Sequence, residues 1–188
     1  VDDINGDGFN DILIGEPSWD RDNIVRDAGR ISIYYGSGAG IVAKNPWVFN
    51  GDQADGQFGW SVASAGDVNR DGLGDFIVGA PFYDNPQVNE GKAWIFTGQL
   101  FGVSSTPIWS NESNQANAKY GHSVASAGDI DGNGYSEVLV GAIWFDNPSS
   151  NEGRVYLYSS GANGVSAQPT WTAESNRETT EFGASIAS

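Results

Sequence analysis

The stretch Asp67-Val68-Asn69-Arg70-Asp71-Gly72-Leu73-Gly74-Asp75 decides the fold of this chain. Oxygen-bearing side chains stand at its first, third, fifth and ninth positions, and a glycine stands at its sixth. Such a loop wraps a hard cation such as Ca²⁺, because alternate side chains turn inward and the glycine allows a sharp bend. The seventh residue can add its backbone carbonyl. The stretch therefore predicts a calcium-binding loop.

The same pattern occurs at residues 3–11 and 129–137, which favours calcium over ordinary solvated turns rich in Asp and Asn. We therefore predict three Ca²⁺ sites. The predicted side-chain ligands are Asp3, Asn5, Asp7 and Asp11 in the first loop, Asp67, Asn69, Asp71 and Asp75 in the second, and Asp129, Asp131, Asn133 and Glu137 in the third. The predicted carbonyl ligands are Phe9, Leu73 and Tyr135. We expect the third loop to bind more weakly, because it carries Asn133 and Glu137 where the others carry aspartate.

The loops belong to a longer internal repeat. The segment 58–64, Phe-Gly-Trp-Ser-Val-Ala-Ser, returns at 120–126 and again at 182–188, each time 62 residues later. Within the middle unit, short apolar or alternating runs predict strands at about 59–65, 76–79, 92–97 and 108–111. Four antiparallel strands per repeat are typical of a β-propeller blade. We therefore predict an all-β fold of three four-stranded blades.

The repeat also predicts how the chain is organised. We expect one propeller segment over 1–188, with complete units at about 58–119 and 120–181 and a third unit split between 182–188 and 1–57. Writing Ser188 directly before Val1 continues the repeat without a gap. Three blades cannot close a ring. The pattern favours a segment of a longer array or ring, or chains that dock head to tail and complete each other's split blade.

Composition narrows the classes of partner. The formal charge is −15, which argues against nucleic acid, and no long apolar run predicts membrane insertion. The chain has no cysteine, which fits a bacterial-type secreted protein. The lone histidine, His122, and the recurring Ser61, Ser123 and Ser185 are expected to be structural, because no catalytic motif surrounds them. For the recurring aromatic residues, core packing between blades is expected, with a sugar-stacking platform as the alternative; these residues are Trp19, Trp47, Tyr83, Trp109, Phe145 and Trp171.

Three motifs in fixed order identify a family resemblance that covers nearly the whole chain. Phe-Gly-x-Ser-Val-Ala at 58–63, the acidic loop at 66–75 and Val-Gly-Ala-Pro at 78–81 resemble the FG-GAP repeat of integrin alpha-chain propellers and their bacterial relatives. The resemblance implies a propeller blade with Ca²⁺ in the hairpin loop between its first two strands. It also implies an extracellular adhesion or ligand-binding module, or an accessory domain beside an enzyme. The proline of the third motif is absent from the third unit, which has Gly141-Ala142-Ile143.

The function predicted from these features is a calcium-stabilised, non-enzymatic, extracellular or cell-surface module for adhesion or scaffolding, which could form a tandem array or fibre. The expected partners are further copies of the repeat, in the same chain or in neighbouring chains, and a protein or glycan ligand. A lectin-like or protein-binding propeller is the first alternative. An accessory domain of a secreted enzyme is the second.

Overall fold

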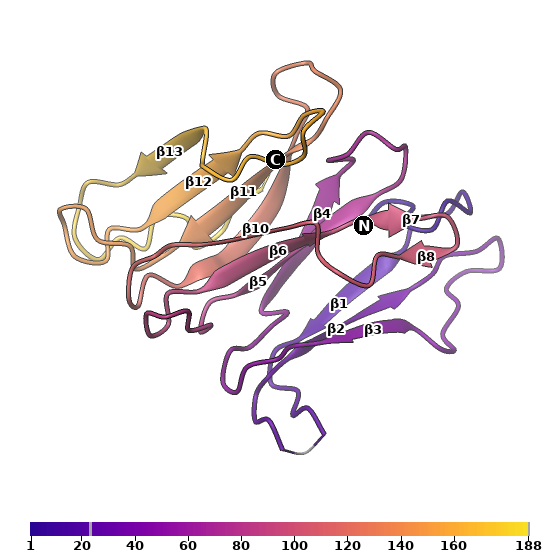
Figure 1. Ribbon diagram of the computed structural model, residues 1–188, viewed down its shortest axis with the longest axis horizontal. Helices are drawn as coiled ribbons and strands as arrows, with labels where there is room; N and C mark the ends of the chain where they lie inside the picture. Colours follow the sequence, from indigo (N-terminus) through magenta and orange to yellow (C-terminus); the bar gives the residue numbers. More distant parts are fainter. Residues whose placement is uncertain (23, 188) are drawn as a thin grey trace.

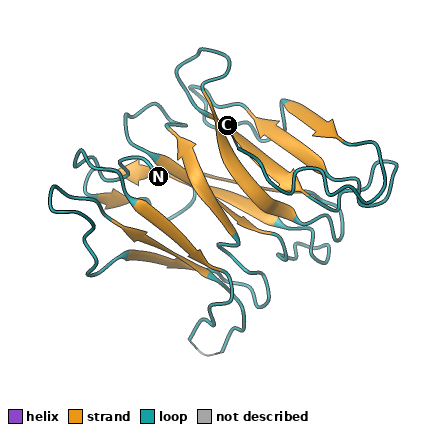
Figure 2. Ribbon diagram, turned by 180° about the vertical axis from the view of Figure 1, so that it is seen from behind, coloured by secondary structure: helices purple, strands orange, loops and turns teal. Residues whose placement is uncertain are grey.

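The computed structural model describes residues 1–22 and 24–187, and in these residues it contains thirteen β-strands and no helix. Three antiparallel sheets lie side by side, as Figure 1 shows. Loops make up the rest of the chain (Figure 2). No helix long and apolar enough to cross a membrane is found in the described residues.

Each sheet takes its strands in chain order, as in a propeller blade. The first sheet consists of β1 (Ile12–Glu16), β2 (Arg30–Tyr34) and β3 (Trp47–Asn50). The second consists of β4 (Ser61–Gly66), β5 (Asp75–Ala80), β6 (Lys92–Phe96) and β9 (Trp109–Glu112). The third consists of β10 (Tyr120–Gly128), β11 (Glu137–Ala142), β12 (Arg154–Tyr158) and β13 (Trp171–Glu174). The predicted all-β fold of blade-type sheets is confirmed, and the strands of the middle repeat are displaced by no more than two residues from their predicted bounds. Two sheets have the predicted four strands, whereas the first has three, because no strand of the described residues pairs with β1 in the way that β4 pairs with β5. The sheets do not close into a ring.

One pair of strands was not predicted. β7 (Gly98–Gln99) and β8 (Gly102–Val103) form a two-stranded hairpin after β6. This hairpin reaches the first acidic loop, where the backbone N–H groups of Gln99 and Phe101 donate to the carbonyls of Ile4 and Asn5 at 3.1 and 2.9 Å. These hydrogen bonds join two different repeats, so no pattern within a single stretch of the sequence predicts the hairpin.

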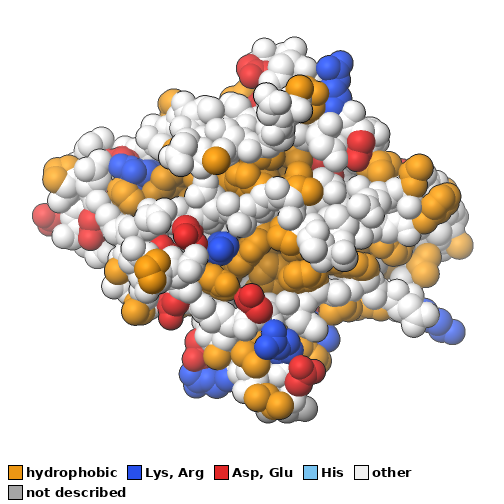
Figure 3. Space-filling view, viewed as in Figure 1, with side chains coloured by type: hydrophobic (Ala, Val, Ile, Leu, Met, Phe, Trp, Pro, Cys, Tyr) orange, Lys and Arg blue, Asp and Glu red, His pale blue; other side chains and the backbone are white. Residues whose placement is uncertain are grey.

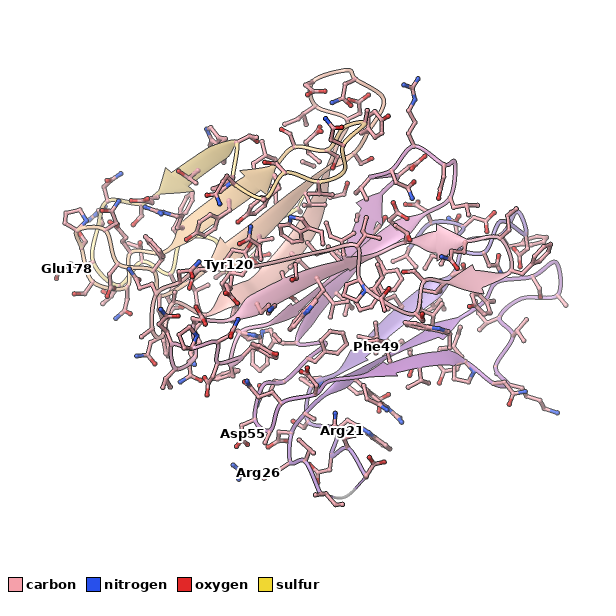
Figure 4. The ribbon with its side chains drawn as sticks, in the orientation of Figure 1. Arg21, Arg26, Phe49, Asp55, Tyr120 and Glu178 are labelled. Carbon is pink, nitrogen blue, oxygen red and sulfur yellow. The ribbon has the colours of Figure 1, made fainter. Side chains whose placement is uncertain are left out.

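Apolar side chains fill the two spaces between neighbouring sheets. Between the first and second sheets, Ile31 and Ile33 pack with Phe76, Val78 and Phe96, all fully buried. The second and third sheets bury an equivalent cluster. Figure 4 shows Phe49 directed from the first sheet toward the second, and Figure 3 shows hydrophobic side chains gathered in hollows at the centre of the face in view. β5, inside the second sheet, is therefore buried on both faces, which explains its continuous apolar run.

The two glycine motifs of the repeat contact each other between successive repeats. A Cβ on Gly79, in β5, would lie 2.0 Å from the carbonyl oxygen of Gly121 in the next repeat. The same carbonyl accepts a hydrogen bond of 2.7 Å from the Ser61 hydroxyl. Ser123 bonds the carbonyl of Gly183 in the same way. These contacts explain why the motifs recur together, and they confirm the predicted structural role of Ser61 and Ser123, whose hydroxyls donate hydrogen bonds to the next repeat.

Two of the recurring aromatic residues do not pack between blades. Trp171 is 53% exposed, because no sheet covers the outer face of the third sheet in the described residues. Trp19 is 38% exposed, and the guanidinium of Arg30 lies 3.4 Å from its ring centroid. The predicted core role is wrong for these two residues. It is confirmed for Trp109 and Phe145, which belong to a core cluster, and for Trp47 and Tyr83, which are partly buried and pack against the other cluster.

Candidate metal centres

The three acidic loops occupy equivalent places in the fold. The second connects β4 to β5, the third connects β10 to β11, and the first leads directly into β1. Each loop thus precedes the second strand of a blade, at the same end of its sheet. Because neighbouring sheets lie side by side, the loops also lie near one another.

The first aspartate of each loop holds the turn together. Asp3 Oδ1 accepts hydrogen bonds from the N–H groups of Gly6 at 2.8 Å and Asp7 at 3.1 Å, and its Oδ2 accepts one from Gly8 at 2.7 Å. Gly6 and Gly8 have φ of 74° and 89°, a left-handed conformation that glycine adopts without strain. The aspartate is therefore directed into the concave side of the loop.

The third and fifth positions also turn inward. Asn5 Oδ1 accepts from the N–H of Asp7 at 3.0 Å, and Asp7 Oδ1 accepts from the N–H of Phe9 at 2.9 Å. Asn69 and Asp71 make the corresponding bonds at 2.9 Å each. Inward-facing carboxylate and amide oxygens are the donor set that Ca²⁺ takes.

The ninth position has a structural task that the loop pattern did not reveal. Asp75 is fully buried, and its two oxygens accept from the N–H groups of Val68 at 2.9 Å and Gly98 at 3.0 Å. Asp11 bonds Ile4 and Gly36 in the same way. This carboxylate thus ties the loop to the end of the third strand of the blade.

Burial raises the pKa of Asp75 to about 7, although its two backbone hydrogen bonds oppose the shift. The nearby carboxylates Asp71 and Asp67 raise this pKa further. Burial also raises the pKa of Asp11. Crowded and partly desolvated carboxylates repel one another, and a bound cation would offset that repulsion.

The third loop brings its acidic side chains closest together. One oxygen each from Asp129, Asp131 and Glu137 lie within 4.8 Å of one another. Asn133, at the fifth position, donates from its amide to Asp131 Oδ2 at 3.1 Å and directs its oxygen at the N–H of Tyr135 at 2.8 Å. Three converging carboxylate oxygens fit a hard divalent cation, so the residues present agree with the predicted donor set.

Direct hydrogen bonds link successive acidic loops. The N–H of Gly74 donates to the carbonyl of Asp3 at 2.8 Å, and the N–H of Ser136 donates to the carbonyl of Asp67 at 2.9 Å. Both donors occupy the eighth loop position. Sequence reasoning missed these bonds, and the recurring small residue at that position is the one available signal. The loops therefore form a connected row across the three sheets.

The histidine lies away from the acidic loops. His122 is half-buried, with its ring centroid 5.6 Å from that of Trp60. Burial lowers the pKa of His122. Its aromatic neighbour agrees with the predicted structural role.

The similarity of this chain to known proteins agrees with its fold. The FG-GAP repeat family model matches residues 1–34, 58–96 and 120–158. The chain is similar to Integrin alpha-5 of Xenopus laevis, with 36% identity over 173 residues that cover 87% of this chain and 16% of that protein. It is also similar to Integrin alpha-PS2 of Drosophila melanogaster, with 37% identity over 157 residues, which cover 77% and 11% of the two chains.

Integrin alpha-IIb of Mus musculus shows 36% identity over 147 residues, which cover 76% of this chain and 14% of that protein. The chain thus spans less than a fifth of the length of these curated relatives. The family model nevertheless matches all three repeats, and it does so over the segments that carry the glycine motifs and the acidic loops. The chain belongs to the FG-GAP repeat family.

Proposed function

We propose that the chain is a calcium-stabilised, non-enzymatic module of an extracellular or cell-surface protein, with adhesion or scaffolding as its task. The observation that carries this proposal is the convergence of Asp129, Asp131 and Glu137 within 4.8 Å, in a loop pattern that the chain repeats three times. Each loop would supply four side-chain ligands and one carbonyl. The similarity to integrin alpha chains supports the extracellular adhesion role.

Cation binding would stabilise more than a single loop. Each loop bonds its neighbour through its first and eighth residues, and its ninth residue bonds the end of a strand. A ligand that binds only the folded state stabilises that state by mass action. At ten times the dissociation constant, each site would contribute about 1.4 kcal/mol. Three sites would then raise the melting temperature by roughly 10 °C.

Calorimetric titration and thermal unfolding test this role together. We expect three Ca²⁺ per chain, with dissociation constants of about 10⁻⁴ to 10⁻³ M, and a melting temperature that falls when a chelator is added. Asp67→Ala should reduce the number of Ca²⁺ ions bound per chain from three to two. Asp71→Asn is the matched control, because the third loop itself has Asn133 at this position, so the count should stay at three.

The calcium role would be wrong if the chelator left the melting temperature of the parent chain unchanged. It would also be wrong if Asp67→Ala and Asp71→Asn bound the same number of ions as each other. Circular dichroism before titration ensures that both variants retain the β fold. The assigned residues are thereby tested separately from overall folding.

Further copies of the repeat, in the same chain or in neighbouring chains, are the partners that we propose.

A ligand-binding module is the second candidate function, and exposed aromatic side chains at one rim favour it. Trp60 is 42% exposed and Trp144 is 38% exposed, and such rings can stack on sugars or peptide side chains. Screening on glycan and extracellular-protein arrays tests this candidate, and Trp60→Ala should abolish any binding that is found.

A further inference from the structure

A hollow of about 210 Å³ lies between the first and second sheets, and we call it the aromatic hollow. On one side it is lined by Phe49 of β3 and by the loop that follows β3, which supplies Asp52 and Phe58. On the other side it is lined by Trp94 of β6. Phe49 is directed from its strand toward the second sheet (Figure 4). Sites for drug-sized ligands are larger, so a hollow of this size suits a small group.

Three aromatic rings wall the hollow at an angle to one another. The ring centroids of Phe58 and Trp94 lie 5.2 Å apart with an interplanar angle of 71°, and those of Phe49 and Phe58 lie 5.6 Å apart at 48°. Rings in this arrangement direct their negative faces toward a common space from several directions, which attracts a cation. The chain itself uses this property, because the ammonium of Lys92 lies 5.8 Å from the ring centroid of Trp94.

A carboxylate stands beside the rings. Asp52 is exposed and lies next to Tyr83, since burial raises the pKa of the Tyr83 hydroxyl and the neighbouring Asp52 carboxylate raises it further. In the described part of the chain, no lysine or arginine forms an ion pair with Asp52. Arg21 reaches the same loop, but its guanidinium donates to the carbonyl of Gly51 at 3.1 Å. The hollow therefore has a negative charge that a bound cation would neutralise.

The second internal interface differs at two of the four positions that matter. The counterparts of Phe49, Asp52, Phe58 and Trp94 are Asn111, Asn114, Tyr120 and Tyr156. The two tyrosine rings keep the arrangement of the first interface, with centroids 5.2 Å apart at 68°. Asn111, however, replaces the third ring with an amide that donates across the interface at 2.9 Å, and Asn114 carries no charge. Packing of neighbouring sheets thus requires neither the third ring nor the carboxylate.

We propose that the aromatic hollow binds a quaternary ammonium group, such as that of choline. The rings would face the methyl groups of the cation, and Asp52 would supply the opposite charge. A quaternary ammonium has no N–H, so it enters an apolar site without leaving donors unpaired, as a primary ammonium would. The formal charge of −15 also favours a cationic ligand over an anionic one. This binding site goes beyond the proposed calcium-stabilised module and does not depend on it.

A sugar is the competing ligand, because aromatic side chains also bind sugars. A sugar stacks on a flat ring face that is open to solvent and pairs its many hydroxyls with polar groups. In the hollow, Phe58 is only 4% exposed, and its ring is tilted against those of both Phe49 and Trp94. The geometry is therefore that of an enclosure and favours the compact cation.

NMR and calorimetric titration of the chain with choline chloride, in the presence of Ca²⁺, tests the proposal. Choline should bind at one site and shift the indole signal of Trp94, which is the one of seven tryptophan signals that disappears in Trp94→Phe. Dimethylbutanol, the neutral isostere with carbon in place of nitrogen, should bind at least about tenfold more weakly. Asp52→Asn should weaken choline binding about five- to tenfold. A parallel titration with phosphatidylcholine vesicles distinguishes the sources, since binding of free choline alone identifies the free ion and binding of both identifies the lipid headgroup.

Asp55→Asn is the matched control, because Asp55 belongs to the same loop and pairs with Arg26 at 2.7 Å. It removes the same charge and should leave choline affinity unchanged. Phe49→Asn copies the second interface and should abolish binding, and the melting temperature of each variant verifies that it is folded.

Four results would overturn the inference. These are equal binding of choline and dimethylbutanol, tighter binding of a methyl glycoside than of choline, equal losses in Asp52→Asn and Asp55→Asn, and no binding of choline at all. The last result, together with a melting temperature that still responds to calcium, would leave the calcium role standing.

Discussion

Lys119 is a buried charged side chain whose protonated form is destabilised in the folded chain. It is 5% exposed, with its ammonium 3.7 Å from the ring centroid of Phe82 and 5.4 Å from that of Trp144. The aromatic rings attract the cation, but burial removes its hydration. The balance lowers the pKa of Lys119 to about 8, with burial as the main cause and Asp84 opposing it.

This shift predicts a pH dependence at the residue scale. The unfolded chain holds the Lys119 proton up to a pKa of about 10.4, whereas the folded chain releases it near 8. Between these values the unfolded state binds more protons, so the contribution of Lys119 to stability rises with pH. We therefore expect the free energy of unfolding of the parent chain, measured in urea, to rise relative to that of Lys119→Met between pH 7.5 and pH 10. A difference that is constant over this range would contradict the prediction, and Lys44→Met controls for loss of a lysine at an exposed site.

At the scale of the elements, the repeat is held together where two backbones meet. β5 approaches the next repeat so closely that the carbonyl of Gly121 occupies the space a side chain on Gly79 would need. The same close approach recurs at two other glycines. A Cβ on Gly15 would lie 2.0 Å from the carbonyl oxygen of Gly59, and a Cβ on Gly141 would lie 2.4 Å from that of Gly183. The glycine motifs are thus a packing requirement between repeats.

Gly79→Ala should consequently lower the free energy of unfolding by about 1–3 kcal/mol, because the added methyl group meets backbone that cannot turn aside. Chemical denaturation measures the effect. Gly161→Ala is the matched control, since a Cβ there meets nothing within 4 Å, and it should change stability little. Equal effects of the two substitutions would argue against the close contact.

At the scale of the whole molecule, the three sheets differ in how they are covered. The second sheet packs against a neighbour on both faces, and every residue of β5 is buried. The first and third sheets each have one open face, and the outer strands β3 and β13 are partly exposed along their length. The interior of the molecule is therefore its middle repeat.

Hydrogen exchange should follow this arrangement. Under conditions where the chain is monomeric, amides of β5 should exchange most slowly, and those of β3 and β13 most rapidly, because local opening of an outer strand exposes less apolar surface. Mass spectrometry of the exchanged and digested chain resolves these strands. Uniform protection across the three sheets would contradict this order of exchange.

Local patterns determined much of this protein. The loop spacing predicted where the acidic side chains turn inward, and the 62-residue period predicted three blades with strands close to their observed bounds. Both features depend on residues close together in the chain, whose geometry is set by turn chemistry and by the alternation of side chains along a strand. The family follows from the same residues.

Contacts between distant parts of the chain were decided only by the tertiary structure. Asp75 is predicted as a loop ligand, and only the structure shows that this buried side chain also links the loop to a strand end through its bond to Gly98. Trp109 and Trp171 stand at the same repeat position, but one is buried and the other is exposed. The sequence specifies which surface of a blade is apolar. Whether that surface is covered depends on what packs against it, which no residue within the blade determines.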